Sequence, residues 1–275
     1  MLLRLQRPLV DSARAYDDYA PRYDRLLVAN RINAYMRQEM SRTLLQVFAS
    51  GTRLIELGCG TGDEAIALAL KGCKVTAFDP SPRMIEIASH KADEAGVGRD
   101  IRFVVARGSE LDPTLAQLGD ATSFDGAYAS FSLSYEPDLF AVVGALAGHI
   151  RPGGRVVIAI MNRVCLIELA AAALSGHPAL AGRRIRSPTV HKVGKHLTAI
   201  FPRSAEQVER ALRPAFVLEW VRALPAIIPP HYANRAFKRW PALLDLLRVA
   251  DDRFASMPFI RRLGDHTILR FRRAG

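Results

Sequence analysis

Apolar runs alternate with helix-like segments in the first half of the chain. Residues 52–58, TRLIELG, form an apolar run ended by glycine, which predicts a buried strand. Residues 63–72, DEAIALALKG, carry apolar side chains at helical positions and end near a glycine, which predicts a helix. Residues 74–80, KVTAFDP, predict a second strand. This order indicates a doubly wound α/β sheet.

The turn between the first strand and the helix carries glycines at alternate positions. Its spacing is E-x-G-x-G-x-G, with Glu56 followed by Gly58, Gly60 and Gly62. Residues without side chains let a nucleotide-like ligand approach the backbone at the positive end of a helix. Asp79, 21 positions after Gly58, ends the second strand, where an acid accepts hydrogen bonds from ribose hydroxyls.

The same spacing argues against a dinucleotide. The dinucleotide fingerprint G-x-G-x-x-G needs a third glycine at the position of Asp63. A diphosphate would also be repelled by Glu56, Asp63 and Glu64. A positively charged ligand without phosphate fits this turn better.

The segment ELGCGTG followed by AFDPSPRMIEIA resembles motifs I and II of the class I S-adenosylmethionine-dependent methyltransferases. The likeness covers most of residues 15–160 and is of the small-molecule type, broadly similar to the quinone C-methyltransferases. It implies a Rossmann-like, doubly wound, seven-stranded and mostly parallel sheet with an α-rich substrate cap. It also implies that Glu56 lies near the amino group of the methionine moiety and that Asp79 binds the ribose.

The implied cofactor is S-adenosyl-L-methionine, and the product S-adenosyl-L-homocysteine. Upstream, AYDDYAPRYDRL resembles an N-terminal lid, with Tyr16 and Tyr23 as its aromatic residues. In the loop after the third strand the acid usual in the family is replaced by Ser109, which leaves Glu110 as the alternative. The cofactor contacts implied by the resemblance are Tyr23, Glu56, Gly58, Cys59, Gly60, Gly62, Asp79, Pro80, Met84, Ser109, Glu110, Ser130 and Phe131.

The resemblance also organises the second half of the chain. The segment RPGG predicts a turn before the fifth strand, and Ser204 with Gln207 has the spacing of a capping box, which predicts a helix after a short strand pair. The segments AFVLEWVRAL and HTILRFRR resemble the last two strands, which pair antiparallel in this family. The expected units are an N-terminal helical lid at 1–45, a cofactor-binding core at 46–162, a cap insertion with a helix at 163–215, and the last two strands with a helical insertion at the substrate mouth at 216–275.

The expected reaction is direct in-line transfer of a methyl group to a small, hydrophobic metabolite, for which the protein mainly supplies orientation. The insertion between the last two strands is rich in proline and bulky apolar residues. We expect an apolar acceptor pocket to be formed there by Ile227, Ile228, Tyr232, Phe237 and Trp240.

A phenol, enol or carbon acceptor needs a general base, for which histidine is suited because its pKa lies near neutrality. His231 is favoured because it follows a Pro-Pro turn in the expected pocket region, and Tyr135 and Glu136 beyond the fourth strand are alternatives. The sequence does not choose among these and the other candidates by residue type, which are His191, His196 and His266.

Charge is distributed unevenly along the chain. Residues 1–150 hold 16 Lys and Arg against 19 Asp and Glu, whereas residues 151–275 hold 22 against 8, so the net charge of +11 comes from the C-terminal half. Such a half attracts an acidic substrate, an anionic membrane surface or nucleic acid, or is simply a solvated surface. It leaves open peripheral membrane contact and an RNA-directed methyltransferase.

Two observations disfavour nucleic acid as the partner. The fourth strand is followed by ASFSLSYEPD rather than by an Asn/Asp-Pro-Pro-aromatic motif, and the similar PPHY lies far away at 229–232. No RNA-binding module is evident. A protein that binds the cofactor without turnover remains the second alternative.

The remaining composition indicates an intracellular enzyme without a metal. Cys59, Cys73 and Cys165 are odd in number and lack CxxC spacing, which predicts neither disulfides nor a zinc site. No apolar run is long enough to span a membrane, and the N-terminus does not resemble a secretion signal. We therefore expect a cytoplasmic location, and the oligomeric state stays open.

Overall fold

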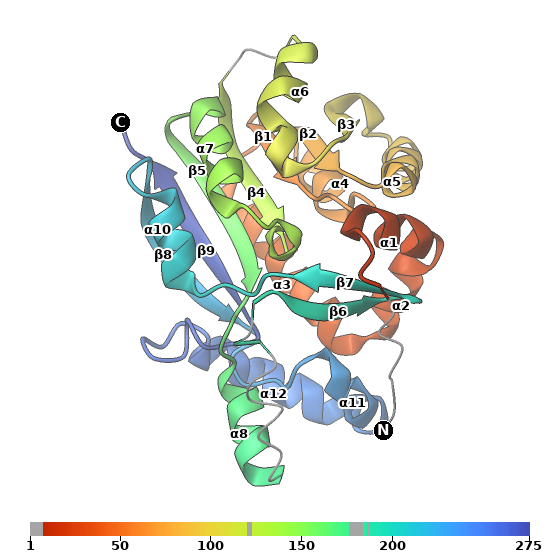
Figure 1. Cartoon of the computed structure of the whole chain (residues 1–275), viewed down its shortest axis with the longest axis vertical. Coiled ribbons are helices and arrows are strands. Elements are labelled where there is room, and N and C mark those ends of the chain that lie inside the picture. Colours follow the sequence, from red (N-terminus) through yellow and green to blue (C-terminus); the bar gives the residue numbers. More distant parts are fainter. Residues whose placement is uncertain (1–7, 120–122, 176–183, 186) are drawn as a thin grey trace.

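A seven-stranded sheet with strand order β3-β2-β1-β4-β5-β9-β8 runs through the computed structural model (Figure 1). The structure describes residues 8–119, 123–175, 184–185 and 187–275. The strands of this sheet are β1 (Arg53–Leu57), β2 (Lys74–Asp79), β3 (Ile101–Val105), β4 (Phe124–Ser130), β5 (Ile150–Met161), β8 (Phe216–Leu224) and β9 (His266–Arg273).

Strands β1 to β5 are parallel, and β9 is antiparallel to both of its neighbours, β5 and β8. The chain passes from β1 outward to β3 and then returns to the other side of β1 for β4, so the crevice outside the carboxyl ends of β1 and β4 is the expected ligand site of such a sheet. Because β9 runs the opposite way, its first residue, His266, pairs with Met161 at this same edge. The predicted fold class is confirmed.

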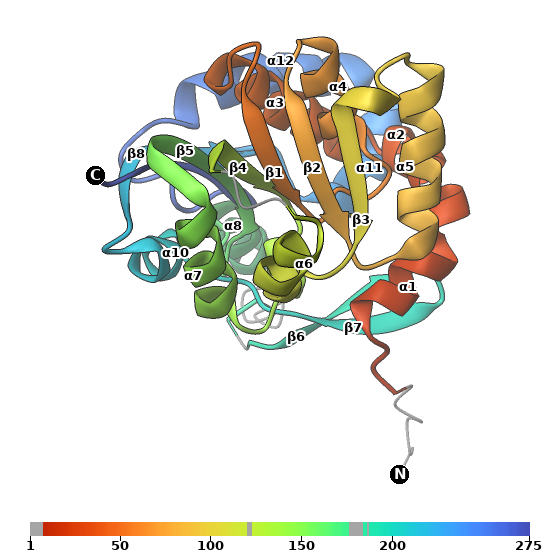
Figure 2. The same cartoon turned by 90° about the horizontal axis from the view of Figure 1, so that it is seen from above.

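Helices cover both faces of the sheet (Figure 2). Helices α3, α4 and α5 lie on one face, and α6, α7 and α10 on the other. The described helices are α1 (Ser12–Tyr19), α2 (Tyr23–Ala29), α3 (Arg31–Val47), α4 (Asp63–Leu70), α5 (Pro82–Glu94), α6 (Leu111–Gln117), α7 (Leu139–His149), α8 (Leu166–Ser175), α10 (Ala205–Leu212), α11 (Asn234–Arg239) and α12 (Pro241–Phe254), with short 3-10 turns η1 (Ala20–Arg22), η2 (Gly98–Asp100), η3 (Gly108–Glu110), η4 (Leu133–Tyr135) and η5 (His231–Ala233).

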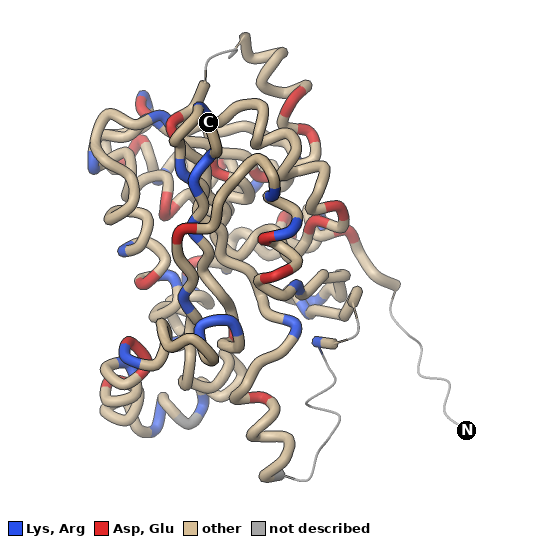
Figure 3. Tube along the Cα trace, turned by 90° about the vertical axis from the view of Figure 1, so that its left-hand side faces the viewer, with Lys and Arg blue, Asp and Glu red and all other residues tan. Residues whose placement is uncertain are grey.

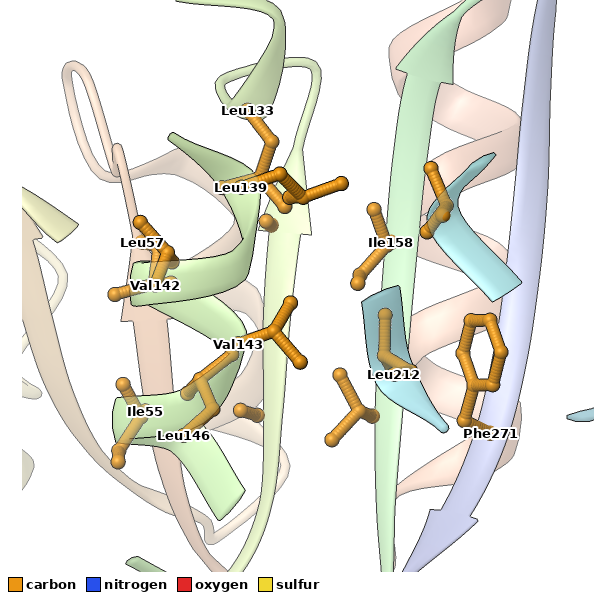
Figure 4. Packing of buried hydrophobic residues seen from close by; sticks show 14 of the residues in the cluster. Ile55, Leu57, Leu133, Leu139, Val142, Val143, Leu146, Ile158, Leu212 and Phe271 are labelled. Carbon is orange, nitrogen blue, oxygen red and sulfur yellow. The ribbon is translucent and has the colours of Figure 1, made fainter. Parts of the chain in front are cut away.

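The two faces explain why the strands read as unbroken apolar runs. Successive side chains of a strand point to opposite faces, and here both faces are covered. Ile55 and Leu57 therefore pack under α7, as Figure 4 shows for Val142 and Leu146, whereas Leu54, the residue before Ile55, belongs to the cluster on the opposite face.

A two-stranded hairpin of β6 (Thr189–Val193) and β7 (His196–Ile200) lies outside the main sheet and beside α1 (Figure 1). Helix α10 follows it and begins with the predicted capping box. The Ser204 hydroxyl accepts from the Gln207 amide at 3.3 Å, and the Gln207 side chain accepts from the Ser204 amide at 2.9 Å. The predicted strand pair and helix are confirmed, as are the two antiparallel strands at the end of the chain.

The expected turn at RPGG differs in form. Strand β5 already begins at Ile150, which pairs with Phe124, and pairing resumes with Arg155 opposite Gly126. The proline and glycines therefore form an irregularity inside one long strand, where Gly153 takes a φ of 78°.

Helix α12 packs on the sheet layer through a buried acid. The Asp251 carboxylate accepts from the backbone amides of residues 226–228 at 2.7 to 3.2 Å and from the Tyr35 hydroxyl of α3 at 3.0 Å. These four hydrogen bonds tie α12 to α3 and to the loop after β8. None of the described helices combines the length and apolarity that crossing a membrane needs.

We predict that Gly62→Ala lowers the free energy of unfolding by about 2 to 4 kcal/mol, through a strained left-handed backbone and overpacking together. Gly62 has a φ of +82°, and an added Cβ would lie 2.9 Å from the Ala88 Cβ. Denaturant unfolding measures the loss.

Gly96→Ala is the matched control, because Gly96 has a φ of +73° but no atom within 4 Å of an added Cβ. This variant should lower the free energy of unfolding by about 1 to 2 kcal/mol, which is the contribution of the strained backbone alone. Equal losses in the two variants would show that packing at Gly62 adds nothing.

Candidate functional site

A cavity of about 520 Å³ opens at the carboxyl edge of the sheet. One side is formed by the glycine turn, the tip of β2 and the end of β4. The other side is formed by the N-terminal helices, the β6–β7 hairpin and the starts of η5 and β9. Its size falls within the usual range for small-molecule sites.

The three glycines of the turn have different surroundings. A Cβ on Gly58 would lie 2.3 Å from the Ser132 Cβ, so this glycine lets the loop after β4 approach the turn. Gly62 lies outside the cavity wall and permits packing against α5 and β3. Gly60 lines the cavity, and the nearest side-chain atom to its Cβ position belongs to Tyr23, 3.9 Å away. Gly60 is therefore where a ligand can reach the backbone.

Asp79 holds the turn in place from the tip of β2. Its carboxylate accepts from the Gly60 amide and from the Ser81 amide, each at 2.9 Å. Burial raises the pKa of Asp79, although both hydrogen bonds act in the opposite direction. Asp79 also lines the cavity, which leaves its remaining lone pairs available to a ligand.

Glu56 is fully buried and does not belong to the cavity wall. The Tyr128 hydroxyl donates to its Oε2 at 3.0 Å, while Oε1 has no hydrogen-bond partner among the described residues. Burial, and next the charge of Glu64, raise the pKa of Glu56 well above its ordinary value. Arg37 of α3 lies in the wall and pairs with Glu64 at 2.9 Å. Sequence reasoning missed Arg37, because nothing in its neighbours marks it.

The N-terminal helices are fastened over the turn by acidic residues that sequence reasoning also missed. Asp17 accepts from the Ser81 hydroxyl at 2.8 Å and from the Arg83 amide at 2.9 Å. Asp24 accepts from the Thr61 hydroxyl and pairs with Lys91 at 2.8 Å. Tyr16 and Tyr23 thereby reach the cavity wall.

The loop after β3 departs from the expectation in its geometry. Arg107 and Gly108 line the cavity, but Ser109 and Glu110 do not. The Glu110 carboxylate instead turns back and accepts from the Arg107 amide at 2.8 Å. The other expected cofactor contacts that lie in the wall are Cys59, Pro80, Met84, Ser130 and Phe131.

Tyr135 and Glu136, two of the expected catalytic residues, also lie in the wall. Arg203 holds their loop by donating to the carbonyls of Leu133 at 2.7 Å and Pro137 at 3.1 Å. The Tyr135 and Tyr16 hydroxyls share a hydrogen bond of 2.6 Å, and both residues line the cavity. Burial raises the pKa of Glu136 in spite of nearby Arg107.

Three of the four candidate histidines meet in the wall: His191 of β6, His231 of η5 and His266 of β9. The ring centroids of His191 and His231 lie 6.5 Å apart, and those of His266 and Phe131 lie 5.2 Å apart. Burial lowers the pKa of His231. His196 lies elsewhere and bonds to Asp18 at 2.7 Å.

The prediction that residues of the insertion between the last two strands form an apolar acceptor pocket is wrong. None of its five residues lines the cavity. Ile228 and Phe237 are buried in the core cluster that includes α3, and the Asp251 carboxylate accepts from the Ile228 amide at 3.2 Å. Trp240 is exposed, and the half-exposed Tyr232 donates to Glu168 at 3.1 Å. The apolar part of the wall comes instead from Leu26, Leu27, Met36, Met161, Val193 and Ile200.

A buried ion network lies behind His266. Arg184 pairs with Glu168 at 2.8 Å and with the Asp265 carboxylate, and Asp265 Oδ2 lies 2.9 Å from His266 Nδ1. Burial opposes ionisation of Asp265, but His266 and Arg184 together hold its pKa below the ordinary value. In the part of the chain that the structure describes, no group of three or more His, Cys, Asp or Glu could hold a metal ion.

Comparison with known proteins agrees with this geometry. A family model described as a methyltransferase domain matches residues 31–243. The chain is 30% identical over 173 residues to a ubiquinone biosynthesis O-methyltransferase of Xylella fastidiosa strain 9a5c, covering 63% of this chain and 60% of that protein. It is 28% identical over 239 residues to the 27-O-demethylrifamycin SV methyltransferase of Amycolatopsis mediterranei, covering 76% and 79%.

A third relative, the ubiquinone biosynthesis O-methyltransferase of Methylocella silvestris, is 35% identical over 113 residues, or 41% of each chain. The match thus spans less than two thirds of either ubiquinone-biosynthesis relative. Among solved structures, the [4+2]-cyclase SpnF covers 97% of this chain and 98% of its own at a TM-score of 0.62 and 18% identity. The N-methyltransferase NodS of Bradyrhizobium japonicum WM9, in complex with S-adenosyl-L-homocysteine, covers 97% and 100% at a TM-score of 0.58 and 16% identity.

The sheet order, the glycine turn with Asp79 and the family match define the class: the chain belongs to the methyltransferase-domain family of class I S-adenosylmethionine-dependent enzymes. The cofactor of this class is S-adenosyl-L-methionine. The site has room for it, has an open approach at Gly60, and keeps the buried Glu56 Oε1 and Ser130 Oγ without protein partners among the described residues. Its acidic groups suit a ligand that carries an ammonium and a sulfonium but no phosphate.

We predict that Arg184→Met lowers the free energy of unfolding by about 3 to 5 kcal/mol, because it leaves the buried carboxylates of Glu168 and Asp265 without their counter-ion. Thermal or denaturant unfolding measures the effect.

Arg213→Met serves as the control, since Arg213 pairs with Glu209 on the surface with 71% of its side chain exposed. This variant should lose less than about 1 kcal/mol. Similar small losses in both variants would contradict a structural role for the buried network.

Proposed function

We propose that this protein transfers the methyl group of S-adenosyl-L-methionine to a small molecule by direct in-line displacement. The observation that supports this most is that two different groups of residues line the same cavity. The glycine turn with Asp79 forms one wall, and histidine and tyrosine side chains form the other. Cofactor and acceptor would thus meet within one enclosed space.

We assign the cofactor contacts as follows. Asp79 accepts hydrogen bonds from the ribose, Gly60 allows close approach, and Pro80 and Met84 with Gly108 border the adenine. Tyr23, Ser130 and Phe131 surround the methionine end. Glu56 balances the ammonium group from beneath the turn, for which its Oε1 has no other partner among the described residues.

When bound, the cofactor supplies an electrophilic methyl group on a sulfonium. The residues of the chain would orient the acceptor toward that methyl group and exclude water, which is where most of the rate gain of such a transfer arises. The lid helices serve this purpose, because Asp17 and Asp24 hold them across the turn.

An oxygen acceptor is favoured over nitrogen, carbon or sulfur. Two of the relatives are named as O-methyltransferases of ubiquinone biosynthesis, and another as acting on 27-O-demethylrifamycin SV. The acceptor wall offers Tyr16, Tyr135, His191, His231 and His266, which suit a hydroxylated molecule. Its remaining part is apolar, so the acceptor we propose combines a hydroxyl with a hydrophobic body.

The two alternatives have less support. Figure 3 shows acidic positions among the basic ones, and Glu219 lies 3.1 Å from Arg155 and 3.1 Å from Arg270, so part of the basic half is neutralised rather than free for RNA. Binding without methyl transfer is the stronger rival, because SpnF shares this fold and is named as a cyclase. Turnover, not fold, separates these functions.

We predict micromolar binding of both S-adenosylmethionine and S-adenosylhomocysteine by calorimetric titration. Asp79→Ala should weaken it by about 1.5 to 3 kcal/mol, because hydrogen bonds to a charged group are lost. Asp79→Asn should weaken it less, since its amide oxygen still accepts one backbone hydrogen bond.

Asp112→Ala is the control, because Asp112 bonds to His149 on the surface and does not line the cavity. The affinity of Asp112→Ala for both ligands should equal that of the wild type. No binding by the folded wild type would refute the proposed function, and binding without methyl transfer to any hydroxylated acceptor would favour the rival.

We predict that cofactor binding releases a proton from Glu56. Its pKa is raised in the free protein, and an adjacent ammonium would favour the carboxylate and lower that pKa. Affinity should therefore rise with pH from about 4.3, the ordinary value for glutamate, up to the raised pKa. Titration in buffers of different ionisation enthalpy counts the protons.

Glu56→Gln should bind more weakly and release no proton in this range. Proton release that persists in this variant would assign it to another group, such as Glu64 or Asp79. Wild-type binding without release would make Glu56 a structural partner of Tyr128 alone.

A further inference from the structure

His266 stands at a particular place in the sheet. It is the first residue of β9, pairs with Met161 at the carboxyl edge, and lines the cavity. Strand β9 is antiparallel to β5, so its beginning lies where β4 and β5 end. A side chain at this position adjoins the proposed methionine end of the cofactor site.

An aspartate orients the ring of His266. Asp265 Oδ2 lies 2.9 Å from His266 Nδ1, and only 2% of the Asp265 side chain is exposed. An ionised carboxylate only accepts hydrogen bonds, so Nδ1 carries the hydrogen. In the neutral ring, Nε2 then keeps its lone pair and is able to accept a proton. Among the described residues, the hydrogen bond of the His266 ring is the one made at Nδ1.

Asp265 is itself held from several directions. Arg184 donates to its carboxylate and, at 2.9 Å, to its backbone carbonyl. Asn162, just after β5, donates its amide to the same carbonyl at 3.1 Å and its side chain to the Gly264 carbonyl at 2.8 Å. Such a fixed carboxylate maintains the orientation of the imidazole and stabilises its protonated form.

The ring of His266 also touches a strained residue. Phe131 follows β4 directly and has a φ of 64°, and its ring meets that of His266 edge to face with centroids 5.2 Å apart. Strained backbone that is maintained beside a cavity is common at functional sites. Through this contact, His266 lies beside Phe131, which we have assigned to the methionine end of the cofactor site.

We propose that His266, oriented by Asp265, is the general base that takes the proton of an acceptor hydroxyl. This inference rests on the proposed function. The O–H bond breaks as its proton passes to Nε2, an oxygen lone pair forms the bond to the methyl carbon, and the sulfur keeps the electrons of the broken S–C bond. The charge of the resulting imidazolium is balanced by Asp265, whose other neighbour is Arg184.

His231 is the competing base. Its electrostatic neighbours are Asp265, His266, Arg184 and Glu168, and burial lowers its pKa. Its backbone carbonyl accepts from the Asn30 side chain at 3.0 Å and from the Asn234 amide. The carboxylate of Asp265 is bonded to His266 instead, so the geometry orients the ring of His266 for proton transfer.

The test uses 4-nitrophenol, whose ionised form absorbs visible light, with the protein alone and with its S-adenosylhomocysteine complex. If His266 takes the proton, bound probe pairs as phenolate with imidazolium, and its apparent pKa falls by about 1 to 3 pH units relative to free probe. His266→Asn and His266→Gln should abolish this fall, and Asp265→Asn should reduce it.

His196→Asn is the control, because His196 bonds to Asp18 outside the cavity. It should ionise the probe as the wild type does. His231→Asn changes the cavity wall, so it is expected to alter the affinity for the probe while the bound probe keeps its fall in apparent pKa. The proposal is overturned if the wild type leaves the probe un-ionised or unbound, if both folded His266 variants keep the fall, or if His231→Asn alone removes it.

Failure of the proposed function gives a different result. A wild type that binds neither S-adenosylmethionine nor S-adenosylhomocysteine loses the methyl-transfer assignment, whereas the titration of probe with the protein alone still decides whether His266 accepts a proton.

Discussion

The rest of the site depends on the hydrogen bonds that the Asp79 carboxylate accepts from the amides of Gly60 and Ser81. These bonds join the turn after β1 to the start of α5, so the glycine turn stays open toward the cavity. The Ser81 hydroxyl extends the connection to Asp17 of α1. One carboxylate therefore links the sheet, the turn and, through Ser81, the N-terminal helices.

Buried carboxylates on the two sides of the cavity have pKa values shifted in opposite directions. Near the glycine turn, burial raises the pKa of both Glu56 and Glu64 despite the charge of Arg37, and the carboxylates of Glu64 and Asp63, respectively, add to this effect. Near β9, Asp265 stays ionised because Arg184 and His266 surround it. In the proposed reaction, the first arrangement would accommodate the cationic cofactor, and the second would orient the ring of His266 toward the acceptor hydroxyl.

Local patterns in the sequence were sufficient for much of the fold. The strand, glycine turn, helix and second strand follow from apolar runs and glycine positions, and the capping box of Ser204 and Gln207 forms as its spacing predicts. Asp79 belongs to this group, since it lies directly at the end of a strand that the sequence marks. Each of these features depends on residues that are neighbours along the chain, so spacing alone carries the information.

Only the tertiary structure decided which residues form the part of the cavity wall that we propose for the acceptor. His191, His231 and His266 come from a hairpin, a 3-10 turn and the last strand, and they meet because β9 inserts between β5 and β8 while the hairpin folds back against α1. Of the apolar residues expected in that wall, Ile227 and Ile228 are held away from the cavity by backbone hydrogen bonds to Asp251. By itself, the sequence was sufficient to predict the class of the protein and the glycine turn. The partners of a buried acid lie far away along the chain, and no local spacing records which segments the folded sheet will bring together.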